Sequence, residues 1–534
     1  MKGASCGRRR VMACTAVLHL MRALACGVIV AIAGCAGLPA NVERQPSSAF
    51  TDTGRTQLAR SLASAVAAHP GKTGVYAMPS GREAFGARVA LASVAERSID
   101  AQYYIWHDDI TGVLLLRTLR DAADRGVRVR LLIDDNNTKG MDAVIAMMDA
   151  HANVEVRLFN PFANRSTRLA DYAGDFSRLN RRMHNKSFTV DNQATIVGGR
   201  NIGDEYFGAA DEIEFADLDV IAAGAVVRDV SAQFDAYWNS ASAYPAASIV
   251  GKSSPEADAQ VLARWDELMR EPRAGKYIDA VRDTPLVNQL LTSALPMEWV
   301  TARLVNDDPA KVLHPPERTE LHMLPRLITA LGRPLNELDL VSPYFVPTDD
   351  GTRALRALAD SGVKVRVLTN SLSATDVGPV YAGYSKYREA LLSGGNLQLF
   401  ELKRSAPDDS EAADRKRRGI GSSSDAGLHA KTFAADRQRI FIGSFNLDPR
   451  SSRLNTEMGL VIDSATLASK LSDLFAQGIP RTQYEVRLAA DGQGVEWVEQ
   501  SPTGPVIHRA SPETGVMRRA WIRFLSVLPI DWLL

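Results

Sequence analysis

The chain has 534 residues, of which 46% are hydrophobic and 23% charged. It is therefore long enough for more than one hydrophobic core and too apolar for a disordered protein. Lys and Arg together number 62, and so do Asp and Glu. This even balance excludes a protein that coats nucleic acid through net charge alone, so local groups of residues must select the binding partners.

All four cysteines lie in the first 35 residues, at Cys6, Cys14, Cys26 and Cys35. No disulfide framework is therefore expected in the body of the protein. The leading stretch is basic as far as Arg22, apolar over 23–33, and rich in small residues before Cys35, which is typical of a secretory signal. Its end resembles the bacterial lipobox, in which the cysteine becomes the lipidated first residue of the mature chain. The alternatives are a simple membrane anchor or a later start at Met12 or Met21.

Cleavage after residue 34 removes five cationic and no acidic side chains, which leaves a formal charge of −5 and disfavours nonspecific nucleic-acid binding. The following segment, 35–60, contains Pro39 and Pro46 and is predicted to be a tether. Ala36 lacks the acidic character that marks retention in the inner membrane for lipoproteins of this kind. We therefore expect a protein anchored through Cys35 that faces the periplasm, with the outer membrane favoured.

The body repeats one order of predicted elements, which is the mark of an internal duplication. The first copy has a strand at 98–106, a helix at 112–125 and strands at 127–134 and 154–159; the second has a strand at 338–345, a helix at 351–361 and strands at 363–368 and 397–402. Strands that alternate with helices predict parallel pairing beneath a helical layer. We expect an α/β fold with two pseudo-symmetric lobes, each a mixed or mostly parallel sheet flanked by helices, and an active site between them.

The expected boundaries place the first lobe at 61–250 and the second at 298–480. The charged segment 251–297 is predicted to be a helical link. The remaining residues, 481–534, are predicted to be an extension whose stretch 518–528 is basic and amphipathic. Such a stretch is a candidate for contact with a membrane surface, and packing on the body is the alternative.

Each predicted lobe carries the same pattern of a His, a Lys two residues later, an Asp at seven and an Asn at seventeen. The matched sets are His184, Lys186, Asp191, Gly198, Gly199 and Asn201, and His429, Lys431, Asp436, Gly443, Ser444 and Asn446. Residues two apart on a strand point to the same side, so each His and Lys can share a site. The glycine-rich segments allow close approach to a ligand, which makes Gly199 and Ser444 candidate substrate contacts.

This pattern identifies the chain as a member of the phospholipase D superfamily. Within it, the runs 180–188, 198–204, 444–451 and 454–459 resemble the bacterial cardiolipin synthase C group, and the likeness extends from near Phe85 to Leu534. The exported leader is not carried over from that group. The resemblance implies a phosphatidyltransferase that makes cardiolipin, with phosphatidylglycerol as acceptor and phosphatidylglycerol or phosphatidylethanolamine as donor. The alternatives are a phospholipase D that yields phosphatidic acid, a nuclease of the same superfamily, and a noncatalytic lipid-binding protein.

The resemblance also implies roles for the matched residues. His184 is expected to attack phosphorus and form a phosphohistidine, and His429 to act as general acid and base, although pseudo-symmetry allows the reverse assignment. Lys186 and Lys431 are expected to neutralise the nonbridging phosphate oxygens, to which Asn201 and Asn446 donate hydrogen bonds. Because lysines supply the cations, we expect no metal and no other cofactor.

Each histidine also needs a carboxylate at its other nitrogen. The second lobe offers Glu457, twenty-eight residues after His429, at the position that matches the family. The first lobe offers Asp217, which we favour, or Glu212. Asp191 and Asp436 are predicted to pair locally and fix a turn rather than to act in catalysis.

An arginine-rich stretch precedes the first motif. Arg181 and Arg182 are its members nearest the motif and are candidate ligands of anionic phospholipid headgroups. The alternative is an ordinary solvated loop. His107, which precedes Asp108 and Asp109, is predicted to lie in a surface turn.

Overall fold

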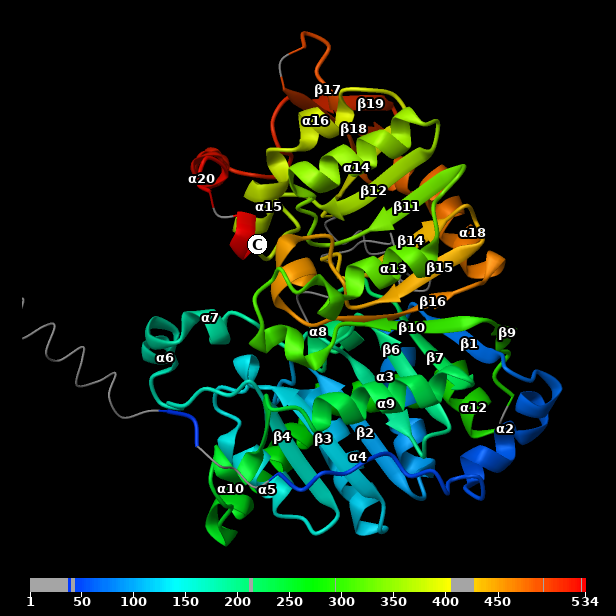
Figure 1. Cartoon of the computed structure of the whole chain (residues 1–534), viewed down its shortest axis with the longest axis vertical. Helices are drawn as coiled ribbons and strands as arrows, with labels where there is room; N and C mark the ends of the chain where they lie inside the picture. The colour runs from blue at the N-terminus through cyan, green and yellow to red at the C-terminus, as the bar shows by residue number, and fades with distance from the viewer. Residues whose placement is uncertain are drawn as a thin grey trace, which may run out of the picture.

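The computed structural model describes residues 37–39, 44–210, 215–292, 294–404, 427–492, 494–529 and 531–534. The signal segment 1–34, the lipidation candidate Cys35 and the candidate carboxylate Glu212 lie outside these residues. Two sheets with helical layers are stacked one above the other, the first lobe below and the second above in Figure 1. The expected two-lobed α/β fold is confirmed.

The first sheet has nine strands in the order β8-β4-β3-β2-β5-β6-β7-β1-β9. They span β1 Thr73–Met78, β2 Ser98–Tyr103, β3 Arg128–Asp134, β4 Val154–Phe159, β5 Ser187–Val190, β6 Ala194–Gly198, β7 Asp219–Gly224, β8 Ala243–Pro245 and β9 Glu298–Val300. The main helices of this half are α2 Gln57–Ala68, α3 Gly81–Val94, α4 Ile110–Asp124, α5 Asp142–Asp149, α6 Arg168–Gly174, α7 Phe176–Leu179, α8 Asp204–Phe207, α9 Val226–Trp238, α10 Pro255–Arg270, α11 Pro272–Arg282 and α12 Pro285–Leu291.

The second sheet has ten strands in the order β10-β16-β15-β14-β11-β12-β13-β17-β18-β19. They span β10 Ala302–Asn306, β11 Glu337–Val341, β12 Lys364–Asn370, β13 Leu397–Leu402, β14 Lys431–Ala435, β15 Arg439–Gly443, β16 Met458–Ile462, β17 Tyr484–Leu488, β18 Val495–Ser501 and β19 Gly504–His508. The main helices here are α13 Met323–Leu331, α14 Thr348–Asp360, α15 Gly378–Ser385, α16 Arg388–Leu392, α18 Ala465–Asp473, α19 Ile479–Thr482 and α20 Val516–Ser526.

The strand orders show how far the duplication extends. Eight strands of the first sheet, β8-β4-β3-β2-β5-β6-β7-β1, correspond in order to β17-β13-β12-β11-β14-β15-β16-β10 of the second. In each lobe three strands are parallel to one another, β2-β3-β4 in the first and β11-β12-β13 in the second, and crossover helices join them. The other neighbouring strands of the duplicated part pair antiparallel. The sheets are therefore mixed, and the expectation of mostly parallel strands holds only for these triplets.

The helix α4 illustrates why the predicted elements form. Its apolar residues Val113, Leu116 and Leu119 recur at helical spacing and are fully or almost fully buried. Asp109 begins the helix by accepting a hydrogen bond from the backbone of Gly112. The helix thus covers one face of the sheet and fixes the start of β3.

The lobes meet through equivalent strands. Side chains of β6 and β7, such as Val197 and Val220, share an apolar cluster with Ile442 of β15 and Leu460 of β16. Burial of this surface away from water holds the two halves together. The expectation that equivalent regions of the lobes face each other agrees with this packing.

The structure corrects three of the expected boundaries. Residues 44–50 of the predicted tether lie on the first lobe, where Arg44 donates to the Ala243 carbonyl and the Ala49 amide to Asp235. The predicted link, α10 to α12, buries Trp265 and Tyr277 in the core of the first lobe, so it is part of that lobe.

The third correction concerns the C-terminal residues. β17 pairs with β13 at the place that β8 occupies beside β4, so 481–534 begins with an integral strand of the second lobe. At the other boundary, β9 pairs with β1 and belongs to the first sheet. Within the described ranges, no helix is both long enough and apolar enough to cross a membrane.

Candidate active site

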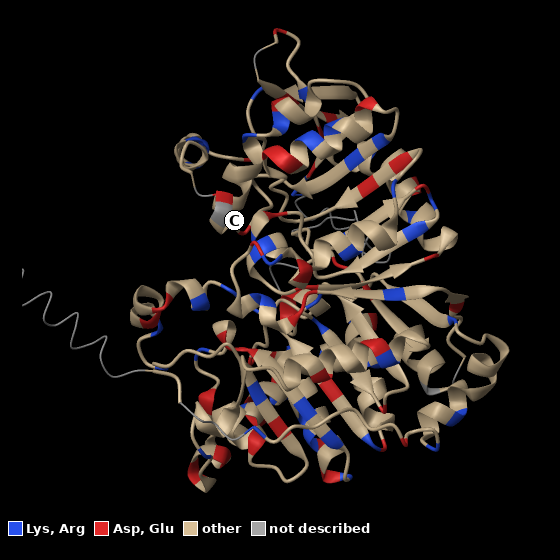
Figure 2. Ribbon diagram, in the orientation of Figure 1, with Lys and Arg blue, Asp and Glu red and all other residues tan. Residues whose placement is uncertain are grey.

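The two sequence motifs lie at equivalent places where the lobes meet. His184 and Lys186 lie immediately before β5. At the equivalent place in the second lobe, His429 lies immediately before β14, and Lys431 is the first residue of that strand. Both histidines are 7% exposed and both lysines 1% exposed. In the ribbon of Figure 2, positions of basic residues (blue) and of acidic residues (red) both occur along the junction of the lobes. The fold therefore gathers ionisable groups from two distant stretches into one nearly buried region.

Backbone hydrogen bonds tie each histidine to the opposite lobe. The His184 amide donates to the Thr456 carbonyl at 2.8 Å, and the His429 amide donates to the Ala216 carbonyl at 2.9 Å. Thr456 and Ala216 each precede one of the candidate carboxylates in sequence. These short parallel bridges, Met183 with Thr456 and Ala216 with Leu428, set the relative position of histidine and carboxylate.

The carboxylates are exchanged between the lobes. His184 Nδ1 lies 2.9 Å from Glu457 Oε2, and His429 Nδ1 lies 2.5 Å from Asp217 Oδ2. Both residues were expected as partners, but pairing within each lobe would have joined Glu457 to His429 and Asp217 to His184. The pairs instead cross the junction, because each histidine lies on the edge of its lobe that faces the other lobe's carboxylate.

Each carboxylate is held in turn by its own surroundings. Glu457 accepts from the hydroxyl of Ser444 at 2.5 Å and from that of Ser451 at 2.8 Å. Asp217 accepts from the Leu218 amide at 2.7 Å. A Cβ on Gly199 would lie 2.2 Å from an oxygen of Asp217, so only glycine fits there.

Gly199 and Ser444, predicted as substrate contacts, therefore act on the carboxylates. They occupy equivalent positions in the two motifs, and each lies against the carboxylate of its own lobe. Each position therefore supports a carboxylate of the protein, and its contact with substrate stays a prediction.

Burial and the lysines dominate the electrostatics. Burial, together with the charges of Lys186 and Lys431, holds the pKa of both histidines well below the ordinary value. Burial also lowers the pKa of Lys186, and it lowers that of Lys431 to about 8. It raises the pKa of Asp217 and raises that of Glu457 to about 7. The site is thus suited to an anion that would compensate the buried lysines.

The arrangement leaves one nitrogen of each histidine for chemistry. Nδ1 is engaged by a carboxylate in both cases, so Nε2 is the nitrogen that remains. A neutral imidazole held by a carboxylate can act as a nucleophile or take up a proton. Two such groups with two lysines can therefore support a displacement at phosphorus.

Comparison with known proteins decides the family. A family model described as "Cardiolipin synthase, PLD-like domain" matches residues 89–238 and 327–479. Cardiolipin synthase C of Escherichia coli (strain K12) is 46% identical over 480 residues, which cover 89% of this chain and 99% of that protein. The chain belongs to the phospholipase D-like cardiolipin synthase family. The resemblance predicted from the two motifs is confirmed.

One further relative and one solved structure also resemble this cardiolipin synthase homologue. A protein of Helicobacter pylori (strain ATCC 700392 / 26695) described as uncharacterized is 29% identical, with 93% of this chain and 96% of that protein covered. The crystal structure of phosphatidylserine synthase from Haemophilus influenzae Rd KW20 covers 80% of this chain and 92% of its own, with a TM-score of 0.51 and 14% identity. That second likeness supports the fold.

The motif aspartates of this cardiolipin synthase homologue are structural, but their partners are distant. Asp191 accepts from the backbone amides of residues 96–98, and Asp436 accepts from those of residues 335–337. Although burial opposes it, these amides hold the pKa of Asp436 below its ordinary value. Each aspartate thus fixes the loop that enters β2 or β11. The predicted local pairing is wrong, since the partner segments lie 93 to 101 residues away along the chain.

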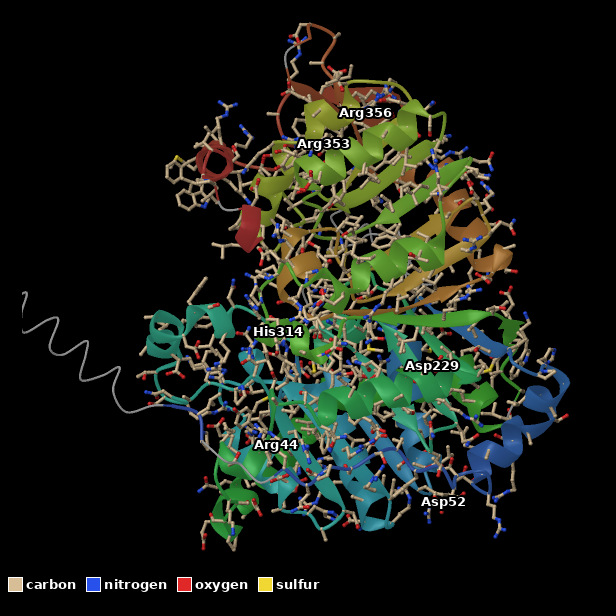
Figure 3. All side chains as sticks on the ribbon, viewed as in Figure 1. Arg44, Asp52, Asp229, His314, Arg353 and Arg356 are labelled. Carbon is tan, nitrogen blue, oxygen red and sulfur yellow. The ribbon has the colours of Figure 1, made fainter. Side chains whose placement is uncertain are left out.

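The predicted headgroup ligands have other partners. Arg182 is 2% exposed and donates twice to Asp134, at 2.8 and 2.6 Å. Asp134 also accepts from the Met183 amide at 2.8 Å, immediately before His184. Arg182 therefore positions the motif instead of meeting solvent. Arg181 donates to the carbonyl of His314, which Figure 3 labels near the junction.

The asparagines differ in their engagement. Asn201 donates to the Tyr206 hydroxyl at 3.1 Å and accepts from the Ile105 amide at 3.2 Å. The side-chain oxygen of Asn446 is buried without a hydrogen-bond partner among the described residues. Both lie directly beyond an equivalent strand, β6 or β15, as the motif predicts.

Aromatic rings around the histidines were missed as site residues. The Tyr104 ring meets His184 edge-on at 4.9 Å between centroids. Tyr206 and Phe215 meet His429 at 5.2 and 5.3 Å. Tyr104 lies at a predicted strand end, but nothing in the spacing of Tyr206 or Phe215 indicates this contact. Only the tertiary fold brings them to the motif.

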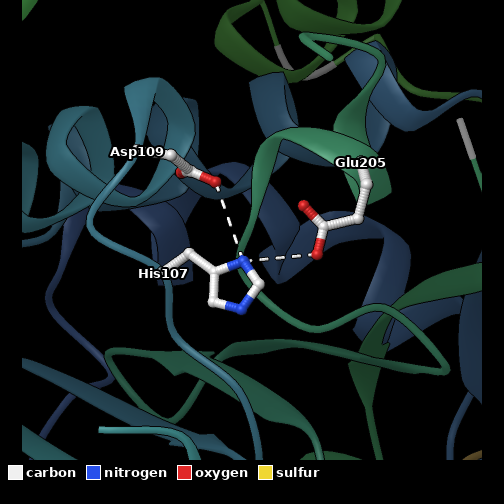
Figure 4. A group of neighbouring side chains, drawn as sticks. All are labelled: His107, Asp109 and Glu205. Carbon is white, nitrogen blue, oxygen red and sulfur yellow. Dashed lines mark ion pairs between the residues drawn. The ribbon is translucent and has the colours of Figure 1, made fainter. Parts of the chain in front are cut away.

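One group in the described ranges has the composition of a metal site. His107 Nδ1 lies 3.3 Å from Glu205 and 3.9 Å from Asp109 (Figure 4). Both Asp109 oxygens already accept backbone amides, from Gly112 and Asp204. A hydrogen bond to Glu205 raises the pKa of His107, which favours an ion pair. We interpret the group as the cap of α4, in keeping with the predicted turn.

Proposed function

We propose that this protein transfers a phosphatidyl group between glycerophospholipids and so makes cardiolipin, with phosphatidylglycerol as the acceptor. The observation that carries the proposal is the pair of buried imidazoles, each held at Nδ1 by a carboxylate of the opposite lobe and flanked by a lysine. The relationship to cardiolipin synthase C supports the same reaction. Phosphatidylglycerol and phosphatidylethanolamine are the candidate donors.

The first step forms a covalent intermediate. Nε2 of His184 attacks phosphorus, and the bond from phosphorus to the headgroup oxygen breaks. The anionic phosphate of the bound donor compensates the lysines, so that His429 can carry a proton on Nε2. His429 gives this proton to the headgroup oxygen, and glycerol or ethanolamine leaves with a free hydroxyl. Lys186 and Lys431 neutralise the nonbridging oxygens, and Asn446 and Asn201 donate hydrogen bonds as charge develops.

The second step reverses the roles. The primary hydroxyl of phosphatidylglycerol gives its proton to His429 and attacks phosphorus. The bond from phosphorus to Nε2 breaks, which regenerates His184 and releases cardiolipin. If water takes the place of the lipid alcohol, phosphatidic acid forms instead, so the acceptor alone separates a synthase from a hydrolase.

We further propose that the protein works at the bilayer, anchored through a lipid on Cys35 and facing the periplasm, with the outer membrane favoured. The lipobox-like sequence before Cys35 supports this anchor. Both substrates remain in the bilayer, so an anchored enzyme meets them without extracting them. Labelling with a radioactive fatty acid, compared with a Cys35→Ser variant, tests the anchor.

Product analysis tests the reaction. Purified protein is incubated with vesicles of labelled phosphatidylglycerol, with and without phosphatidylethanolamine, and the lipids are separated. His184→Ala is the inactive variant, and His151→Ala is the matched control because the His151 ring contacts Asp124 and the Asn153 amide, outside the site. We expect labelled cardiolipin from the wild type and the control, and none from His184→Ala.

The remaining outcomes separate the alternatives. Phosphatidic acid that depends on His184 identifies a hydrolase. Cardiolipin made only when phosphatidylethanolamine is present identifies that lipid as donor. No lipid product from any variant contradicts the proposal, and DNA is then the next substrate to test.

A further inference from the structure

The C-terminal helix α20 has one face on the protein and one face in solvent. Ile522 and Leu525 are buried against the second lobe. On the other side Met517, Trp521 and Phe524 are 83%, 57% and 54% exposed, and they recur at the spacing of one helical stripe. The rings of Trp521 and Phe524 stack at 5.5 Å, so the exposed stripe is a continuous apolar surface. Such surfaces mark interaction sites in soluble proteins.

The charges on and beneath α20 are almost all positive. The helix contains three arginines and no acidic residue, and in Figure 2 it carries blue but no red. A hollow of about 610 Å³ lies between α20, α15, α16 and the β18–β19 hairpin. Its charged lining consists of Arg388, Glu389, Arg509, Arg519 and Arg523.

The arginines of this hollow are incompletely paired. The guanidinium groups of Arg509 and Arg523 have no ion-pair or hydrogen-bond partner among the described residues, whereas that of Arg388 is paired with Glu401. Nε of Arg388 is buried without a hydrogen-bond partner among them. Guanidinium groups bind phosphate oxygens in a bidentate manner, so the hollow matches the chemistry of a phosphate headgroup.

The helix lies on the same side of the molecule as exposed apolar residues of the first lobe. Leu169 of α6 and Phe176 of α7 are 85% and 43% exposed. Arg450 joins the two lobes here, because it donates both to Asn180, which ends α7, and to the Leu533 carbonyl near the C-terminus. Figure 1 shows α6, α7 and α20 on one side, together with the segment 37–39 that follows Cys35 by two positions.

We propose that this side docks on a bilayer of anionic phospholipid, with the apolar stripe of α20 in the interface and a lipid phosphate in the arginine hollow. Apolar residues on one side of a helix and arginines beside them are the features of helices that lie in a membrane surface. The proposal rests on the proposed function, which places both substrates in the bilayer. The docking proposal adds two things to that function. It gives the orientation in which the junction of the lobes faces the lipid substrates, and it places a second phosphate site outside the active site.

Hydrogen exchange on the full-length protein tests the orientation. The protein carries His184→Ala, so that lipids are not consumed, and Cys35→Ser, so that no attached lipid contributes to binding. Exchange is followed with phosphatidylglycerol vesicles, with phosphatidylcholine vesicles and with soluble glycerophosphate. We expect slower exchange over 516–527 with the anionic vesicles, a smaller effect with phosphatidylcholine, and none over that helix with glycerophosphate.

Two pairs of substitutions separate the two parts of the surface. Trp521→Ser with Phe524→Ser is expected to weaken vesicle binding about tenfold or more. Ile328→Ser with Leu335→Ser is the matched control, because these residues are 61% and 73% exposed elsewhere on the same lobe. Arg509→Gln with Arg523→Gln is expected to remove the preference for anionic vesicles, whereas Arg228→Gln, which changes an exposed arginine of α9, leaves it unchanged.

Several results overturn the proposal. Protection confined to other segments, or equal loss of binding in the control variants, removes α20 as the docking element. Equal protection of α20 by glycerophosphate shows a soluble phosphate ligand instead of a bilayer. Activity of the same variants, with His184 restored, is measured in detergent micelles, where we expect it to be retained. An inactive protein in micelles whose α20 is nevertheless protected by vesicles counts against the proposed function and leaves the docking surface intact.

Discussion

The two halves of the active site hold their histidines by equivalent backbone contacts but with different side chains. In the first half the amide before His184 donates to Asp134 at the end of β3, and Arg182 pairs with that aspartate. In the second half the amide before His429 donates at 3.0 Å to Asn370 at the end of β12, a neutral side chain. The same geometry is thus obtained once with a buried ion pair and once with an amide.

The carboxylates differ in a similar way. Glu457 is held by two serine hydroxyls, whereas Asp217 is shorter and lies against a glycine. Each lysine donates to the carbonyl of its own motif histidine, and Lys431 Nζ in addition lies 3.0 Å from His429 Nδ1. The duplicated fold therefore preserves where each imidazole lies and leaves its polar surroundings free to diverge. This divergence is what can make one histidine the nucleophile and the other the acid.

Removing each histidine in turn tests this division of roles most strongly. We expect His184→Ala and His429→Ala each to lower turnover by about 10³-fold or more. A donor with an activated leaving group needs no proton, so His429→Ala should still form the phosphohistidine and His184→Ala should not. Acid quenching after incubation with labelled donor measures the bound label. Label on His429 in the His184→Ala variant would reverse the assignment.

Neutralising the carboxylates tests the exchange of partners between lobes. Glu457→Gln and Asp217→Asn are each expected to lower kcat by about 10²- to 10⁴-fold, because the imidazole loses the group that orients it. In nitrogen NMR of labelled histidine, Glu457→Gln should shift the Nδ1 resonance of His184, and Asp217→Asn that of His429. Shifts in the opposite pattern would contradict the contacts across the lobes.

The pH dependence of the rate sharpens the comparison of Glu457 with Lys431. Burial raises the pKa of Glu457 to about 7, so below that pH the carboxyl gains a proton and no longer accepts from His184. Burial lowers the pKa of Lys431 to about 8, so above that pH the amine loses the charge that faces the phosphate. We expect a bell-shaped profile of kcat/KM with an acidic limb near 7 and an alkaline limb near 8. Lys431→Arg should move the alkaline limb upward, and an unmoved limb would exclude this lysine as its source.

The buried ion pair of the first half is expected to matter for stability more than for chemistry. Asp134→Asn leaves Arg182 buried without its charge partner and should lower the free energy of unfolding by about 3–5 kcal/mol. Adding Arg182→Met to that variant should restore much of the loss, since the second half manages with the neutral Asn370. Urea denaturation followed by circular dichroism measures both. Equal stability of the single and double variants would show that the unpaired charge is not the cause.

Much of the scaffold could be predicted because it follows from local pattern. The strands at 154–159 and 397–402 have the bounds of β4 and β13, and the helix expected at 112–125 overlaps α4 closely. Apolar periodicity and strand-ending turns carry this information over short distances. The motif spacing likewise placed each His, Lys and Asn at equivalent strand ends.

The contacts between distant segments could not be predicted in the same way. Nothing in the spacing within a lobe shows that Glu457 meets His184, because the partner lies 273 residues away and the lobe junction brings it there. Arg182 has the same appearance in the sequence as the half-buried arginines around it, and only its full burial beside Asp134 distinguishes it. β17 follows the expected end of the second lobe, although it pairs with β13 as β8 pairs with β4 in the first lobe.

Residue types and their spacing were sufficient to predict the duplication, the family and the proposed chemistry. The reason is that a nucleophile, a cation and a hydrogen-bond donor must recur at offsets that suit a strand and its turn. Which carboxylate serves which histidine, which glycine or serine supports it, and which arginine is buried were decided by how the two sheets pack. Packing brings together side chains whose separation along the chain carries no information about their distance in space.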